Sequence, residues 1–157
     1  GRFIEGQVAI ANTPARIHRV DLIPPDAVAC SEAVSAIELA DLVVLAPGSL
    51  YTSLLPVIAV PKLREAVLGA RGRVVQVCNL RPQLPETEGL DGTDHLRAVL
   101  DHGGRVDAFL YQGHGTLAVD AAAVRDFGVE PVEVDVTSPG GLAHDAAKLA
   151  NALHALL

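Results

Sequence analysis

The stretch Asp41-Leu-Val-Val-Leu-Ala-Pro-Gly-Ser-Leu-Tyr-Thr-Ser53 is the centre of the predicted fold. Its apolar run, Leu42 to Ala46, is typical of a strand buried on both faces. Pro47-Gly48 ends that strand, and hydroxyl side chains then gather where a helix is predicted to begin. The first N–H groups of a helix lack intrahelical partners, so this corner suits a phosphate or another anion. The alternative is a capped helix with a solvated turn, because the spacing matches neither a dinucleotide fingerprint nor a P-loop.

The rest of the chain alternates between helical patterns and short apolar runs. Helices are predicted over 32–40, 49–60, 63–69, 93–102, 121–127 and 145–157, and strands over 42–46, 73–78, 106–111 and 131–136. Ser31, Thr93 and Asp120 are the predicted N-caps. This order predicts one α/β domain over 1–157, with a Rossmann-like, mostly parallel sheet and helices on both faces. Pro56 predicts a kink or an early stop in its helix.

The first 22 residues precede this alternation of helices and strands and have a β-prone pattern instead. Two short β-prone runs, 7–11 and 16–22, predict a β-hairpin or two edge strands. His18, His102 and His154 fall on faces that the patterns predict to be exposed.

Composition narrows the class of protein. The net charge of −7 argues against a nucleic-acid partner or an anionic membrane surface, and no apolar run is long enough to span a bilayer. Cys30 and Cys78 lack metal-ligand spacing, and we interpret them as buried thiols in a reducing, cytoplasmic compartment. The chain has no Met and begins with Gly1, so we expect a piece of a longer protein.

Three polar loops follow three of the predicted strands. They are Pro47 to Ser53, Asn79 to Gly92 and Gln112 to Thr116. In an open parallel sheet, ligands bind beyond the carboxyl ends of the strands. The sequence therefore predicts that these loops meet at a ligand site.

Two of these loops carry the residues of a known family. Ala46 to Ser53 resembles the G-P-G-S-L-Y-T-S signature of bacterial gluconeogenesis-factor proteins, which share a superfamily with 2-phospho-L-lactate transferase. Cys78 to His95 keeps, without a gap, the register of that family's C-N-L-M-T-Q-P-G-E-T-D-G-Y-T-A-S-D-H motif. His144-Asp145 and Lys148-Leu149 resemble its C-terminal R-H-D and K-L residues.

This resemblance covers the C-terminal half of such a protein, since family members are about twice as long and open with a Gly-rich strand–turn. It implies a cytoplasmic protein required for growth and normal cell shape on gluconeogenic carbon sources. It also implies a nucleotide-sugar ligand, UDP-N-acetylglucosamine or a related UDP-sugar, and either a homodimer or pairing with an N-terminal half. The related transferase instead moves a phospholactyl group onto a deazaflavin and uses a metal.

The resemblance assigns the candidate site. The implied ligand-binding residues are Pro47, Gly48, Ser49, Tyr51, Thr52, Ser53, Asn79, Gln83, Glu86, Thr87 and His144. We expect backbone and hydroxyl contacts to a diphosphate from the first loop, and contacts to a base or sugar from the second. Tyr51 can stack on a uracil ring, although a tyrosine at a helix start is as often a packing residue.

Asp94 and His95 are the candidate acid–base or metal pair, although a first-turn acid such as Asp94 is equally explained by the helix dipole. No metal site is predicted. One departure concerns the ligand: Ala143 stands where the family has an Arg linked to it, and Arg81 can supply a positive charge instead. A binding regulator is our first hypothesis, a phospholactyl or related phospho-group transferase the second, and a truncated, non-binding scaffold the third.

Overall fold

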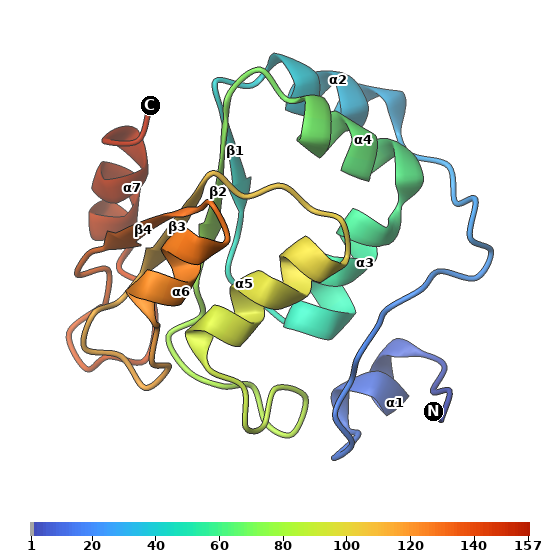
Figure 1. Cartoon of the computed structure of the whole chain (residues 1–157), viewed down its shortest axis with the longest axis horizontal. Coiled ribbons are helices and arrows are strands. Elements are labelled where there is room, and N and C mark those ends of the chain that lie inside the picture. The colour runs from blue at the N-terminus through green and yellow to red at the C-terminus, as the bar shows by residue number, and fades with distance from the viewer. Residues whose placement is uncertain (1) are drawn as a thin grey trace.

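A four-stranded parallel sheet lies at the centre of the computed structural model, which describes residues 2–157 (Figure 1). Its strands are β1 (Leu42–Leu45), β2 (Arg73–Val77), β3 (Ala108–Tyr111) and β4 (Glu130–Glu133). They pair in chain order, β1-β2-β3-β4, and every pair is parallel. The predicted Rossmann-like parallel sheet is confirmed, because each strand returns to the same edge through a helical connection.

Helices cover both faces of the sheet, as predicted (Figure 1). They are α2 (Ser31–Leu39), α3 (Leu55–Ala59), α4 (Pro61–Gly69), α5 (Gly92–Asp101), α6 (Ala121–Asp126) and α7 (Ala146–His154). The larger core packs Phe109 and Val74 against Leu55 of α3 and Leu96 of α5. The smaller core packs α7 against the opposite face of β2, β3 and the segment after β4.

The first strand differs from its prediction. The apolar run predicted burial on both faces, but Val44 is 37% exposed. Its neighbours Val43 and Leu45 point into the larger core and are buried. On the other face, α7 packs against β2 and β3 and leaves Val44 uncovered. A continuous apolar sequence could not show this, because the pattern does not record how far a covering helix reaches.

The helix predicted over 49–60 forms in two parts. A π-helical turn, η1 (Leu50–Leu54), is followed by the short helix α3. Pro56 lies in the first turn of α3, where its missing N–H costs no helical bond. The chain changes from a π-helical to an α-helical turn just before Pro56, and the helix continues to Ala59 and does not stop at the proline.

Three predicted N-caps have different outcomes. Asp120 is confirmed, because its carboxylate accepts hydrogen bonds from the first-turn N–H groups of α6. Thr93 is wrong as the cap of α5: Asp91 accepts from Asp94 N at 2.8 Å, and the Asp94 carboxylate accepts from Asp91 N in return. Thr93 instead accepts from the backbone of Asp120.

At α2, the cap position belongs to Cys30, and Ser31 is the first helical residue. The prediction of two buried thiols is also wrong for Cys30, which is exposed, while Cys78 is buried. Cys30 lies at the start of a surface helix, where no sheet or helix covers it.

The predicted N-terminal hairpin is wrong. Gln7–Ala11 forms a short helix, α1, and residues 12–29 run without helix or strand along the body (Figure 1). We call residues 12–29 the N-terminal strap. Asn12 ends α1 by donating from its side chain and its backbone to Val8 O, which satisfies the backbone locally instead of through a partner strand.

His102 also differs from its prediction as an exposed residue. It is half-buried at the end of α5 and accepts a hydrogen bond from the backbone of Val20 in the strap. Finally, no helix within residues 2–157 has both the length and the apolar character needed to cross a membrane.

Candidate functional site

The three polar loops meet at the carboxyl edge of the sheet, as the sequence predicted. Gly48 at the end of β1 contacts Asn79 at the end of β2. Thr116, in the loop after β3, donates from its hydroxyl to Leu80 O at 2.6 Å. The loops therefore form one continuous surface beyond the strands, which is where open parallel sheets bind ligands.

Asn79 fixes the first loop against the second. Its side-chain oxygen accepts from Gly48 N at 3.0 Å, and its side-chain N–H donates to Gly48 O at 2.8 Å. One amide group thus satisfies both backbone polar groups of Gly48. A residue 31 positions away in the chain sets the path of the loop that follows β1.

Glu86 provides the second connection between these loops. Its side chain is only 4% exposed. The carboxylate accepts from Ser49 Oγ at 2.7 and 2.8 Å and from Tyr51 N at 2.7 Å. Thr52 and Gln83 donate from their side chains at 3.4 and 3.3 Å. The start of η1, which the sequence predicted to suit an anion, therefore binds the carboxylate of Glu86.

Thr87 is also a structural member of the second loop. It is fully buried, and its hydroxyl oxygen accepts from Gln83 N at 2.8 Å. Its own N–H donates to Gln83 O at 2.8 Å. These reciprocal bonds close the turn that places Gln83 on one side and Glu86 on the other.

A cavity of about 450 Å³ opens beside these connected loops. Its volume lies within the range of about 300–1,000 Å³ that is typical of small-molecule sites. The residues that line it are Pro47, Gly48, Asn79, Leu80, Arg81, Pro82, Gln83, Leu142, Ala143 and His144. The structure therefore brings together five of the implied ligand residues, from both loops and the C-terminal motif.

Sequence reasoning did not select three of these lining residues. Leu80 and Pro82 lie inside the second motif, but neither carries a polar group that would mark it as a ligand residue. Leu142 lies in the turn before α7 and is 68% exposed. Its exposure beside a cavity is the only signal, and a sequence does not contain it.

His144 brings a polar ring to the cavity from the far side. Burial lowers the pKa of His144, and a hydrogen bond to the backbone of Cys78 opposes that shift. Its Nε2 is buried and has no hydrogen-bond partner within residues 2–157. A nitrogen of the imidazole ring can donate or accept a hydrogen bond, so Nε2 has unused hydrogen-bonding capacity at this site.

The other implied residues of the first loop lie outside the cavity lining. Tyr51 is 4% exposed and belongs to the larger core, where burial raises the pKa of its hydroxyl. Ser49 and Thr52 are bonded to Glu86, and Ser53 is exposed on η1. The structure thus places Tyr51 as a packing residue under the strap, facing Arg16 and Ile17.

The 2-phospho-L-lactate transferase CofD family matches residues 1–149. The chain belongs to this family. It is similar to a gluconeogenesis factor from Halalkalibacterium halodurans, with 39% identity over 86% of this chain and 42% of that protein. It is also similar to a gluconeogenesis factor from Listeria innocua, with 30% identity over 100% of this chain and 54% of that protein.

A crystal structure of a UPF0052-family protein from Bacillus halodurans shares the fold of this CofD-family chain. The TM-score is 0.90 at 33% identity, and the match covers 96% of this chain and 54% of that one. The chain therefore spans about half the length of the relatives it matches.

Asp94 and His95, the candidate acid–base or metal pair, lie on α5 outside the cavity lining of this CofD-family chain. Asp94 forms the capping box and an ion pair with Arg97 at 2.5 Å. His95 is 2% exposed; Nδ1 lies 2.8 Å from Asp91 O, and burial lowers the pKa of the ring. The structure gives Asp94 the helix-terminal role that its sequence position also explained.

Within residues 2–157, His, Cys, Asp and Glu side chains form no group of three or more that could hold a metal ion. Residues 2–157 therefore do not by themselves supply the ligand set of a metal centre.

Proposed function

We propose that this CofD-family chain forms one wall of a nucleotide-sugar site in a gluconeogenesis factor, with UDP-N-acetylglucosamine or a related UDP-sugar as the ligand. The observation that carries the proposal is the cavity at the carboxyl edge of the sheet. Residues from both sequence motifs line it, together with His144. Relatives that are 30–39% identical and named gluconeogenesis factors support the gluconeogenesis-factor part of the proposal.

Arg81 is the group proposed to bind the diphosphate. It is the one charged side chain among the residues that line the cavity within the described chain, and it is exposed. A guanidinium binds phosphate oxygens through two parallel charge-assisted hydrogen bonds. Arg81 would thus supply the contact that Ala143, on the opposite wall, cannot make.

The remaining polar groups fit the neutral parts of the ligand. His144 lines the cavity and its Nε2 has no hydrogen-bond partner within residues 2–157, so the ring can bond a sugar hydroxyl or a polar group of the base. Gly48 has open space where a Cβ would lie, so a ligand can approach its backbone closely. Glu86 has a supporting role in this proposal: it orders the first loop and does not contact the ligand.

Calorimetric titration of the complete translated protein with UDP-N-acetylglucosamine tests the proposal. Gly48→Ala places a methyl group at the cavity wall, where nothing lies within 4 Å, so the fold should be unchanged. We expect the affinity to fall by about tenfold or more, equivalent to about 1.4 kcal/mol. Gly69→Ala is the matched control, because its added methyl group also meets nothing, at the end of α4.

Arg81→Ala tests the phosphate contact in the same titration. Binding of UDP should weaken strongly, while Arg71→Ala, an exposed arginine that does not line the cavity, should leave it unchanged. No binding heat from the unaltered protein would overturn the proposal. A folded protein with no affinity for UDP-sugars would instead support the non-binding scaffold.

The proposal extends to the whole protein. It places the protein in the cytoplasm, as a regulator of growth and cell shape on gluconeogenic carbon sources and not as an enzyme. Normal growth and shape of a deletion strain on such a carbon source would contradict this part.

A phospholactyl transferase is the second candidate, and the family match over residues 1–149 favours it. Transfer of a phospholactyl group to a deazaflavin acceptor, followed by mass spectrometry with added Mg²⁺, would distinguish the two. Formation of the phospholactylated product would displace the binding-only proposal.

A further inference from the structure

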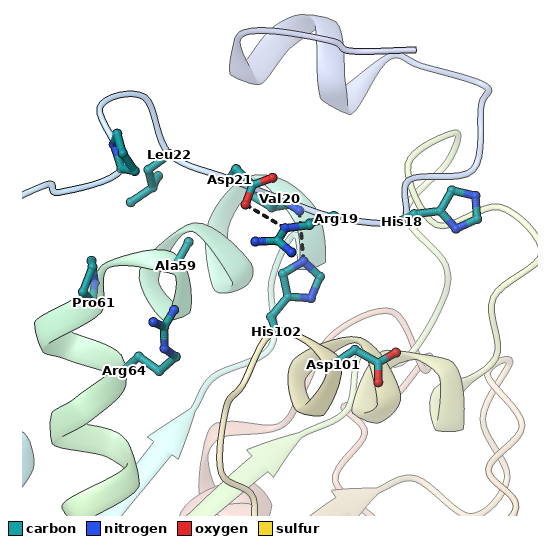
Figure 2. A pocket seen from close by; sticks show the side chains of 11 residues that line it. His18, Arg19, Val20, Asp21, Leu22, Ala59, Pro61, Arg64, Asp101 and His102 are labelled. Carbon is teal, nitrogen blue, oxygen red and sulfur yellow. Dashed lines mark hydrogen bonds and ion pairs between the residues drawn. The ribbon is translucent and has the colours of Figure 1, made fainter. Parts of the chain in front are cut away.

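The N-terminal segment is attached to the body by very little polar contact. Among the hydrogen bonds within residues 2–157, a single one joins residues 2–29 to the rest of the chain. Val20 N donates to His102 Nε2 at 2.9 Å, which Figure 2 shows from close by. The other attachments are apolar: Ile10, Ile17 and Val20 pack against the larger core.

The hydrogen bonds of His102 define its protonation state. Nδ1 lies 2.6 Å from Ala98 O, one turn earlier on α5, and a carbonyl oxygen can only accept, so Nδ1 carries a proton. Nε2 accepts from Val20 N, so it carries none. Only the neutral ring makes both bonds, because a proton on Nε2 would face the N–H of Val20.

Solvent reaches this contact through a cavity of about 290 Å³ beside it (Figure 2). The ring can therefore exchange a proton with water while the body stays folded. The charged and titratable groups around His102 in this cavity are His18, Arg19 and Asp21 of the strap, Arg64 of α4 and Asp101 of α5. A second, smaller cavity adds Arg16 of the strap and Asp94 and Arg97 of α5.

These neighbours are nearly balanced in charge. Arg19 pairs with Asp21 at 2.7 Å, and Arg97 pairs with Asp94. Arg64 and Asp101 are opposite in sign. No cluster of one sign therefore dominates the ring, and the loss of its acceptor is the main consequence of protonation.

We propose that His102 is a proton-controlled latch that holds the strap closed while its ring is neutral. Histidine is the side chain suited to such a switch near physiological pH. The direction of the pH dependence follows from the hydrogen bond between Val20 N and His102 Nε2. The strap is closed above the pH at which Nε2 takes up a proton, and it opens as the pH falls through that value. Ile17 and His18 of the strap line a small cavity together with Tyr51 and residues of α5, so opening of the strap would widen the access to Tyr51.

Amide hydrogen exchange at Val20 tests the latch in the whole chain. The protection factor, corrected for intrinsic exchange, should fall about tenfold between about pH 8 and about pH 5, as expected for the loss of one hydrogen bond. Ring ¹⁵N shifts of His102 should report a proton on Nδ1 alone at the higher pH. His102→Gln places an amide near the position of Nε2 that accepts without titrating, so protection should persist at both pH values.

Two further variants separate the latch from other histidines. His18→Gln should keep the native pH dependence, and His102→Ala should lower protection at both pH values. Burial lowers the pKa of His95 and of His144, so the free energy of unfolding also decreases when the pH falls below about 6.5, the ordinary pKa of histidine. A loss of overall stability therefore does not identify the latch. Local exchange at Val20 does. Equal loss of protection in His102→Gln and the native chain, or no loss in the native chain, would overturn the proposal.

Discussion

The carboxyl edge of the sheet and the N-terminal strap are held to the body in opposite ways. At the edge, Asn79 and Glu86 supply side-chain hydrogen bonds that fix two loops to each other. Within residues 2–157, the strap makes one hydrogen bond to the body, and its Ile17 and Val20 pack against the larger core. Directional bonds fix a loop in one geometry, whereas a few apolar contacts allow a segment to leave as a unit. The difference indicates a preorganised cavity at one place and, elsewhere in the chain, a segment held by few directional bonds.

The rates of thiol labelling should differ most between the two regions. Cys78 lies at the carboxyl edge of the sheet, and Cys30 directly follows the strap. Burial raises the pKa of the Cys78 thiol to about 12, whereas Cys30, just beyond the strap, is exposed. Since only the thiolate reacts, Cys78 should label at least about a thousandfold more slowly with a disulfide reagent at neutral pH. Mass spectrometry of each labelled peptide measures both rates. Comparable labelling rates would mean that the carboxyl edge of the sheet at Cys78 is as accessible as the surface at Cys30.

Glu86→Ala should be the most damaging substitution at the edge. It leaves the buried Tyr51 N–H and the Ser49 hydroxyl without their acceptor, so we expect a loss of about 3 kcal/mol in the free energy of unfolding. Urea denaturation measures it. Glu88→Ala, an exposed neighbour in the same loop, should change stability by less than about 0.5 kcal/mol. Similar stabilities for the two variants would contradict a clamping role for Glu86.

Asn79→Ala should have an intermediate effect. Two hydrogen bonds to Gly48 are lost at a half-buried position, which predicts about 1–2 kcal/mol in the same denaturation assay. Asn151→Ala on the exposed face of α7 is the control and should not destabilise the chain, since Ala has the higher helix propensity, by up to about 0.7 kcal/mol. If Asn79→Ala were also neutral, the first loop would be fixed by Glu86 alone.

Val20→Ala should have the smallest effect on overall stability and a larger one on the strap. Val20 is 9% exposed and belongs to the core cluster, but its segment can open without the sheet. We expect a change below about 1 kcal/mol in unfolding, with faster proteolytic cleavage within residues 12–29. Cleavage followed by gel electrophoresis measures it, with Val57→Ala, 47% exposed on α3, as the control. A large cooperative loss of stability would show that strap and body fold as one unit.

Much of the fold was predictable from local patterns. The alternation of apolar runs with Gly and Pro breaks predicted all four strands and the helices between them, since each depends on residues a few positions apart. The register of the two motifs identified the family and the loops that carry the cavity. The hairpin prediction failed because α1 satisfies its backbone internally, through bonds such as Ile10 N to Gly6 O, which β-propensity does not anticipate.

The amino-acid sequence was enough for the parallel sheet, the meeting of three loops at its carboxyl edge and the family. The roles of individual polar residues needed the folded chain, since Glu86 and His102 find their partners 35 and 82 positions away. The physical reason is the separation of the interacting residues along the chain. Periodicity and turn chemistry act between residues a few positions apart. The partner of a buried carboxylate or imidazole is instead a donor from a distant part of the chain, brought near by packing. Glu86, which the resemblance implied as a ligand residue, accepts hydrogen bonds from the first loop, and His102, predicted to be exposed, is half-buried and accepts the one hydrogen bond that joins the strap to the body within residues 2–157.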